Sequence, residues 1–458
     1  MLASLVVLAQ GRTVLEKRWR HSIPPQTLKE LWSAIQNAGS TPAPPAMQLA
    51  GQLIVHVARG QLVLVGALAR DAPVLLAIEL LHRVGDLLEL YFKELSEEAL
   101  RANFVTVYQL LDEVIENGVP LHTEPNVLQQ LVMQPGKMDS IVASVMGTSQ
   151  VRDALPESTS SASPWRKTGV RYATNELYLD LHERLDVVVD GRNGVLQHAE
   201  VYGEAMCNCM LSRMPRLTLT FTHPHIIEDC SLHVCASKDR WERDRVISFV
   251  PPDGKFELFT YRIARTNQIP IYVTPNISFV ASSSNTQPSS SSAGENGNNG
   301  SSGGGGAVVD VTDGDGSATA QQQGGGGIGH VSVTLGARPT EGRPVEEVSV
   351  RIPLPSSTLS TSLTASVGSV VHDAQSQEVR WTIGRIPKER LPTLNGTVTL
   401  GPGRSARELS LSLFVSFKVN MYSSSGLKVA SLRVENEEHQ PYKGVRSITR
   451  AGRFEVRC

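Results

Sequence analysis

The 458-residue sequence predicts two folded parts of different class: an α+β domain over residues 1–146 and an all-β domain, an elongated antiparallel β sandwich, over residues 164–458. Three observations predict this division. Short apolar runs with Gly-containing turns and longer stretches of helical period share the first part. Residues 147–163 are rich in Ser, Thr, Pro and Ala. After Trp165 the helical period disappears, and short strand-like runs recur to the end.

The α+β part begins with two hairpin signals, in which apolar runs flank the turns Gln10-Gly11 and Arg59-Gly60. Between them, four apolar residues recur at helical spacing: Leu28, Leu31, Trp32 and Ile35. Longer amphipathic patterns follow over 76–92 and 99–115, and Gly118 is predicted as the C′ residue of the last helix. We therefore expect a sheet that helices cover on one side.

Two segments lack the apolar side chains that a packed structure needs. Residues 147–163 are predicted to be a flexible linker between the domains. Residues 281–328 consist largely of Ser, Gly, Asn and Gln without any Lys or Arg, which predicts a disordered insertion in a loop between two strands. A surface loop of this length is tolerated, since each doubling costs only about 0.6 kcal/mol.

Charge and cysteine content argue against several classes of protein. The 43 basic and 45 acidic residues nearly cancel, so no overall field indicates a nucleic-acid partner. The longest apolar region, 62–81, contains Arg70, Asp71 and Pro73, so we expect membrane contact to be peripheral only. An odd set of five cysteines favours a reducing, cytosolic compartment, with ordinary buried thiols expected at Cys207, Cys209, Cys230, Cys235 and Cys458.

No pattern predicts an enzyme, a metal site or a cofactor. The glycine runs at 303–306 and 324–327 lack the Lys-Ser/Thr of a phosphate-binding loop, and no GxSxG elbow is present. Five potential zinc ligands lie close together, but their spacing matches no standard structural site: His223, His225, Cys230, His233 and Cys235. We expect them to be strand and loop side chains.

The stretch ISFVPPDGKFELFTYR at 247–262 contains two prolines and an Asp-Gly turn between apolar runs, which predicts a rigid β corner. It closely resembles the signature of the clathrin-adaptor medium (mu) subunits. Four other stretches carry the same resemblance: WRKTGVRYATNELYLDLHERLD at 165–186, SRMP at 212–215, SSGLKVASLRV at 424–434 and KGVRSITRAGRFEVRC at 443–458.

Within that family the chain is most similar to the mu subunit of adaptor protein complex 3. The stretches that carry this similarity are LLHRVGDLLELYF at 80–92, VYQLLDEVIENGVPLHTEPNVL at 107–128 and ALPESTSSASPWRKTGVRY at 154–172. The resemblance implies a longin-like N-terminal domain that docks into a heterotetramer with two large chains and one small chain. It also implies a C-terminal mu homology domain that binds Tyr-x-x-hydrophobic sorting signals in cytosolic tails of membrane cargo.

The resemblance implies a tyrosine pocket built from Tyr178, Asp180 and Arg446. In the family these residues pack against the cargo ring, accept its hydroxyl hydrogen and cover the ring, respectively. Two positions depart from the pattern. Asn208 stands where the family has a lysine, and Gly444 stands where the endocytic mu subunit has a tryptophan. We expect these differences to alter the signal preference.

The matching residues for the apolar cargo pocket are Leu179, Val429, Leu432 and Val445. Strand alternation places Leu179 on the face opposite to Tyr178, which weakens its assignment. By family resemblance the protein is a non-enzymatic coat adaptor for transport from Golgi or endosomes to lysosome, vacuole or related organelles. It is expected to be cytoplasmic and peripheral on those membranes and on coated vesicles.

An alternative stays open at this point: a scaffolding or lipid-contacting subunit with a degenerate cargo pocket. Basic residues near the C-terminus provide a candidate patch for anionic phospholipid head groups, and a solvated strand surface explains them equally well. They are Lys443, Arg446, Arg450, Arg453 and Arg457.

Overall fold

A computed structural model describes residues 1–38, 42–69, 72–132, 163–281, 327–387, 389–401, 411–435 and 440–458. Apart from Ser163, the predicted linker at 147–163 lies outside the described residues. Most of the predicted insertion at 281–328 also lies outside them.

The N-terminal part contains a five-stranded sheet with strand order β2-β1-β5-β4-β3. The two predicted hairpins, β1–β2 and β4–β5, are confirmed. Its elements are β1 (Leu2–Ala9), β2 (Arg12–Arg18), α1 (Pro25–Gln36), β3 (Ala46–Leu49), β4 (Gln52–Arg59), β5 (Leu62–Leu68), α2 (Val74–Phe92), α3 (Glu97–Ala102), α4 (Phe104–Val114), β6 (Ile115–Glu116), β7 (Val119–Pro120) and α5 (Pro125–Leu131).

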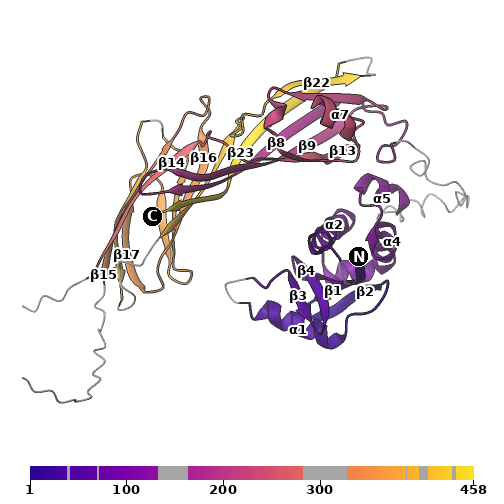
Figure 1. Ribbon diagram of the computed structural model, residues 1–458, viewed down its shortest axis with the longest axis horizontal. Helices are drawn as coiled ribbons and strands as arrows, with labels where there is room; N and C mark the ends of the chain where they lie inside the picture. The colour runs from indigo at the N-terminus through magenta and orange to yellow at the C-terminus, as the bar shows by residue number, and fades with distance from the viewer. Residues whose placement is uncertain are drawn as a thin grey trace, which may run out of the picture.

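Helices cover both faces of this sheet, so the expectation of cover on one side is wrong (Figure 1). One face packs against α1 through Leu28 and Leu31, and the other packs against α2 and α4. The reason is that β1 and β5 are buried along their whole length rather than alternating between core and solvent. A strand that is buried on both sides needs cover on both sides.

The end of the helical region also differs from the prediction. The pattern over 99–115 forms two helices, because Asn103 leaves helical geometry and caps α3. The chain then turns into the short hairpin β6–β7, with Gly118 at φ 82° in its turn. Gly118 is therefore a hairpin residue rather than a helix C′ residue, and its carbonyl accepts a 2.8 Å bond from the Leu2 amide.

The C-terminal part is almost entirely strand, arranged in sheets of nine, four and three strands around one large core. Its elements are β8 (Glu176–Asp190), β9 (Leu196–Met210), β10 (Arg216–Phe221), η2 (Pro224–Ile226), β11 (Asp229–Leu232), α7 (Lys238–Asp244), β12 (Ile247–Phe249), β13 (Gly254–Ile263), β14 (Ile271–Ala281), β15 (Gly327–Ala337), β16 (Val345–Pro353), β17 (Thr358–Ala365), β18 (Ser369–Asp373), β19 (Glu378–Gly384), β20 (Thr393–Leu400), β21 (Ser412–Asn420), β22 (Val429–Glu435) and β23 (Tyr442–Arg457).

Three long strands, β8, β9 and β23, lie side by side in the elongated C-terminal part (Figure 1). The prediction of an antiparallel sandwich holds with one departure, since β23 runs parallel to β8. The insertion boundaries also need correction. Ala281, Gly327 and Ile328 belong to the paired strands β14 and β15 rather than to the connection between them.

Contacts between the two parts involve α5. Three of them are Glu124 Oε2 with His233 Nε2 at 2.7 Å, Asn126 Nδ2 with the Asp253 carbonyl at 3.4 Å, and Gln130 Nε2 with the Pro164 carbonyl at 3.4 Å. None of the helices in the described part of the chain is both long enough and apolar enough to cross a bilayer.

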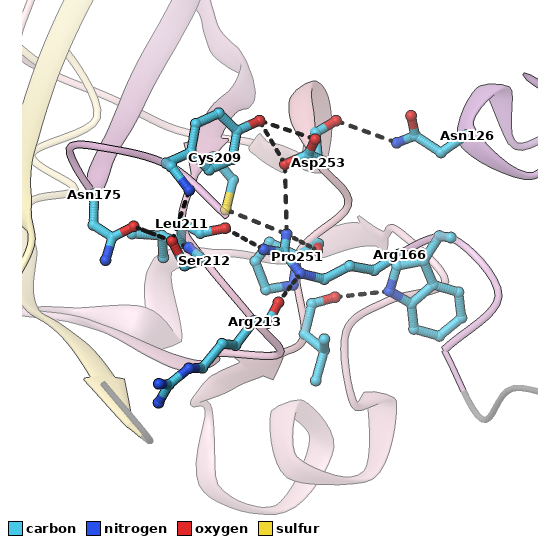
Figure 2. A network of polar contacts seen from close by, with 12 residues as sticks. Asn126, Arg166, Asn175, Cys209, Leu211, Ser212, Arg213, Pro251 and Asp253 are labelled. Atoms are coloured by element: carbon cyan, nitrogen blue, oxygen red, sulfur yellow. Dashed lines mark hydrogen bonds and ion pairs between the residues drawn. The ribbon is translucent and has the colours of Figure 1, made fainter. Parts of the chain in front are cut away.

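The Pro-Pro-Asp-Gly corner is held by the fully buried Arg166 (Figure 2). Its guanidinium donates to the backbone carbonyls of Leu211 at 2.5 Å, Arg213 at 2.8 Å and Pro251 at 3.1 Å. A carboxylate oxygen of Asp253 lies 3.9 Å away. One side chain thus joins the entry to the C-terminal part, the segment after β9 and the turn before β13.

Candidate functional site

The five residues predicted for the tyrosine pocket lie together on the outer face of the nine-stranded sheet. Tyr178 on β8 is opposite Asn208 on β9 and Gly444 on β23. Two residues further along, Asp180 is opposite Arg446. Because alternate residues of a strand share a face, these positions form two adjacent rows on one surface. The intervening leucines of β8 are buried in the core.

Asp180 and Arg446 form a bidentate ion pair. Arg446 Nε donates to Asp180 Oδ1 at 2.8 Å, and Nη2 donates to Oδ2 at 2.6 Å. The hydrogen bonds that Arg446 donates to Asp180 and the negative charge of that carboxylate raise the pKa of the guanidinium. The side chain of Asp180 is 21% exposed and that of Arg446 is 58% exposed, so both groups remain accessible to a ligand. A planar guanidinium fixed in this way can hydrogen-bond and stack at the same time.

Tyr178 packs directly on the backbone of Gly444. A Cβ atom at position 444 would lie 2.8 Å from Tyr178 Cδ1, so a glycine lets the ring occupy this place. The Tyr178 hydroxyl donates to Glu176 Oε2 at 2.9 Å, and this bond is the main reason that the pKa of Tyr178 is raised. The ring is therefore held both at its face and at its hydroxyl.

Sequence reasoning missed two neighbours of this pocket, Tyr442 and Glu176. The Tyr442 ring lies 5.7 Å from the Tyr178 ring, measured between centroids, at 54°, and 62% of Tyr442 is exposed. An aromatic side chain thus stands beside the pocket although position 444 has none. The signal was available, because Glu176 and Tyr442 each precede a predicted pocket residue by two positions and so share its strand face.

The residues predicted for the apolar pocket are not all in one place. Leu179 is 1% exposed and belongs to the core, on the sheet face opposite to Tyr178, as strand alternation predicts. Val445 is its partner on β23 and is half-buried. Val429 and Leu432 are half-buried residues of β22, which pairs with β10 in the separate three-stranded sheet. The residues of the tyrosine pocket therefore belong to the nine-stranded sheet, whereas two residues of the apolar pocket belong to the three-stranded sheet.

Among the described residues, no strand pairs with one edge of the first part of β23, and this edge is called the open edge below. Residues 442–447 pair with β8, whereas the described pairing of β21 with β23 reaches only to Ile448. On that other side the Tyr422 amide donates to the Ser447 carbonyl at 3.2 Å. The Lys443 ammonium donates to the Leu432 carbonyl at 3.1 Å, which places the start of β23 next to β22. The open edge thus runs between the two sets of predicted pocket residues.

The cluster of histidines and cysteines does not form a metal centre in the described part of the chain. His233 contacts Glu124 through Nε2 and accepts a bond from the Cys235 amide through Nδ1. Burial raises the pKa of the Cys230 thiol to about 11 and also raises that of Cys235. All five cysteines are free thiols, and three of them are buried.

Four of the five basic residues considered for a lipid patch have polar partners. Arg446 is bound to Asp180, Lys443 contacts the Leu432 carbonyl, and Arg453 and Arg457 both bind Glu455 at 2.9 Å. The carboxylates of Asp180 and Glu455 reduce the positive charge that this surface offers to an anionic head group.

Comparison with known proteins assigns the chain to a family. The model of the adaptor complexes medium subunit family matches residues 163–299 and 317–458, and that of the clathrin adaptor complex small chain matches residues 5–139. AP-3 complex subunit mu of Dictyostelium discoideum is 36% identical over 466 residues, covering all of both chains. Human AP-3 complex subunit mu-1 is 34% identical over 461 residues, again covering all of both.

The chain belongs to the adaptor complexes medium subunit family. The resemblance drawn from the sequence is thereby confirmed, including its relation to AP-3 mu subunits. The matched small-chain model and medium-subunit model confirm the longin-like and mu homology domains. A chain in a homology model of the full-length AP-3 complex in an intermediate open conformation has the same fold, with a TM-score of 0.53 and 15% identity over all of both chains. Members of this family are adaptors, so the chain is not an enzyme.

Proposed function

We propose that this adaptor medium subunit assembles with two large chains and one small chain, in a complex of the AP-3 type. In this proposal its mu homology domain binds Tyr-x-x-hydrophobic signals in cytosolic tails of membrane cargo, for transport from Golgi or endosomes to lysosome, vacuole or related organelles. The observation that carries the proposal is the exposed, bidentate Asp180–Arg446 pair beside the Tyr178 ring.

The open edge of β23 provides the backbone for recognition. An extended peptide that pairs along residues 442–446 gains main-chain hydrogen bonds that do not depend on its side chains. The tyrosine hydroxyl of the cargo donates to Asp180, and the Arg446 guanidinium lies over the ring. A phosphate on that tyrosine would meet the Asp180 carboxylate, so phosphorylation is expected to block binding.

The half-buried residues Val429, Leu432 and Val445 form the second pocket in this proposal. Each packs on the core and keeps part of its apolar surface accessible. Burying one leucine side chain of the cargo there contributes about 1.5 to 3 kcal/mol. Leu179 supports this pocket from the core rather than contacting the cargo, because it is almost fully buried.

Asn208 and Gly444 remain the expected determinants of signal preference. Asn208 offers a neutral amide beside Tyr178, where the resemblance predicts a lysine in other members. Gly444 lets the Tyr178 ring pack on the backbone of β23, and the exposed Tyr442 ring supplies apolar surface nearby. We expect a retuned pocket rather than a lost one.

Calorimetric titration of the full-length chain with a Tyr-x-x-Leu peptide tests the proposal. Binding is expected for this peptide and is expected to disappear with Ala or phosphotyrosine at the tyrosine position. Asp180→Ala should abolish binding. Asp229→Ala is a matched control, because Asp229 also pairs with an arginine of this sheet, Arg262, at 3.0 Å but lies outside the pocket.

A different result would favour the scaffolding alternative. If no peptide releases heat while vesicles with anionic lipids bind in a salt-sensitive manner, the cargo pocket is degenerate and the domain contacts lipid instead. Equal binding by the Asp180→Ala and wild-type chains would also remove the assigned pocket.

A further inference from the structure

A buried carboxylate lies on the strand that carries the proposed tyrosine pocket. Glu183 follows Asp180 by three positions on β8, points to the opposite face of the sheet, and is only 2% exposed. A buried carboxylate is costly unless hydrogen bonds satisfy it. Asp180 faces the ligand side of the sheet, so the function proposed above leaves Glu183 without a role.

Five neutral donors surround the Glu183 carboxylate. Oε1 accepts from the hydroxyls of Ser423 at 2.8 Å, Tyr261 at 3.1 Å and Ser425. Oε2 accepts from the Ser425 amide at 3.2 Å and from the Thr449 hydroxyl at 3.3 Å, and the Thr449 hydrogen is shared with the Tyr422 carbonyl at 3.0 Å. None of these donors is a cation. The charge is therefore held by oriented hydroxyls and a backbone amide, which strengthens each bond and fixes the direction of each hydroxyl.

Gly203 makes room for this arrangement. It is the cross-strand partner of both Glu183 and Tyr261. A Cβ atom at Gly203 would lie 2.0 Å from the Tyr261 ring, so only a glycine lets this ring cross β9 and reach the carboxylate. The missing side chain at Gly203 therefore provides the space in the core that this hydrogen-bond network needs.

The donors connect three parts of the domain. Tyr261 lies on β13 and Thr449 on β23, whereas Ser423 and Ser425 belong to the loop between β21 and β22. In this loop the chain leaves the nine-stranded sheet and enters the three-stranded sheet. The Ser424 amide also donates to the Thr449 hydroxyl at 3.1 Å. Glu183 therefore ties β22 to the strand that carries Tyr178 and Asp180.

The bonds between Glu183 and the loop before β22 affect how the two proposed cargo pockets lie relative to each other. The residues of the tyrosine pocket lie on β8, β9 and β23, but Val429 and Leu432 lie on β22, directly after the tied loop. The distance between the two pockets depends on how β22 is held relative to β8. A signal with a fixed number of residues between its tyrosine and its apolar residue requires a fixed distance.

We propose that Glu183 is a positioning residue that sets the separation of the two cargo pockets, and with it the spacing of two residues in the Tyr-x-x-hydrophobic signal. This inference rests on the proposed function. A neutral glutamine at this position keeps the shape but loses the charge that orients the hydroxyls, so the loop and β22 gain freedom. Peptides of the wrong spacing should then bind nearly as well as the correct one.

Binding of three peptides to the full-length chain tests the inference. They differ only in having one, two or three residues between Tyr and Leu. For the wild-type chain we expect a preference of about tenfold or more for the two-residue spacing. Glu183→Gln should reduce this preference to within about threefold. Ser425→Ala, which removes one hydroxyl donor without changing β8, should reduce it in the same direction.

The control is Glu455→Gln. Glu455 is another buried glutamate of the same sheet and accepts hydrogen bonds from Ser412, Arg453 and Arg457, but it lies at the far end of β23. A purely structural role predicts lower stability or a smaller active fraction with an unchanged ratio of affinities, as we expect for this control.

The outcomes separate the two proposals. If the wild-type chain binds none of the peptides, the proposed function fails and this inference fails with it. If the wild-type chain selects the two-residue spacing and both Glu183→Gln and Ser425→Ala retain that ratio, only the positioning role of Glu183 is overturned. If Glu183→Gln does not fold, Ser425→Ala alone decides between these results.

Discussion

Replacing Arg166 by methionine should strongly destabilise the mu homology domain. The change keeps a long side chain in the core but removes donors to three backbone carbonyls, those of Leu211, Arg213 and Pro251 (Figure 2). Each buried acceptor left without a partner costs about 1 to 3 kcal/mol. Loss of the buried charge offsets part of this sum, because the guanidinium no longer has to be desolvated. We expect a net loss of about 3 to 5 kcal/mol, as for broken buried ion pairs.

Urea unfolding of the full-length chain, followed by circular dichroism of the strand signal, measures this loss. Lys167→Met is the matched control, since Lys167 is the adjacent basic residue and is exposed. Arg166→Lys keeps the charge but cannot reach three carbonyls, so it should lie close to Arg166→Met. A loss below about 1 kcal/mol, similar to the control, would refute the view that Arg166 holds the Pro-Pro-Asp-Gly corner.

Three further outcomes are expected. Arg446→Lys should weaken binding of the Tyr-x-x-Leu peptide about tenfold with little change in melting temperature, because one ammonium cannot replace two directed bonds; unchanged titration heats would contradict this. Gly203→Ala should lower the free energy of unfolding by about 1 to 3 kcal/mol or more, because its methyl group would overlap the buried Tyr261 ring, and a wild-type urea midpoint would rule out that overlap. The hydrogen bond from Arg457 is the largest cause that lowers the pKa of Glu455 in the folded chain. The ionised Glu455 therefore stabilises the fold above the unfolded pKa near 4.5, and this stabilisation is lost as pH falls through the lower folded pKa. The wild-type chain and Glu455→Gln should converge in stability on acidification, and a constant difference between pH 7 and pH 3 would exclude this linkage.

Large apolar residues at strand or helix spacing made much of the fold predictable. The hairpins, α1, α2, and strands such as β8 and β13 all have such patterns. In β9 the residues that face the core are mostly small, from Ala199 through Ala205 to Cys209. The pattern of β23 is also irregular, because its inward positions include Thr449, a polar residue bonded to Glu183. Neither strand shows the alternation of large apolar and polar side chains that predicts a strand.

The candidate site was predictable only in part, and for a different reason. The family resemblance supplied Tyr178, Asp180 and Arg446, but periodicity alone could not have joined them, because the ion pair spans 266 positions of the chain. Local patterns contain no information on which distant strands become neighbours. For the same reason the buried Glu183 gave no signal: its donors come from residues 78 to 266 positions away.

The parallel pairing of β8 with β23 joins these observations. It brings the last strand of the chain beside the first strand of the mu homology domain, and its register places Arg446 opposite Asp180 and Gly444 opposite Tyr178. A shift of one residue would turn every pocket side chain to the other face of β23. The same pairing brings Thr449 to Glu183 on the core side. The register that assembles the exposed pair therefore also assembles the buried network, so one set of backbone bonds positions both the tyrosine pocket and the loop that leads to its apolar partner.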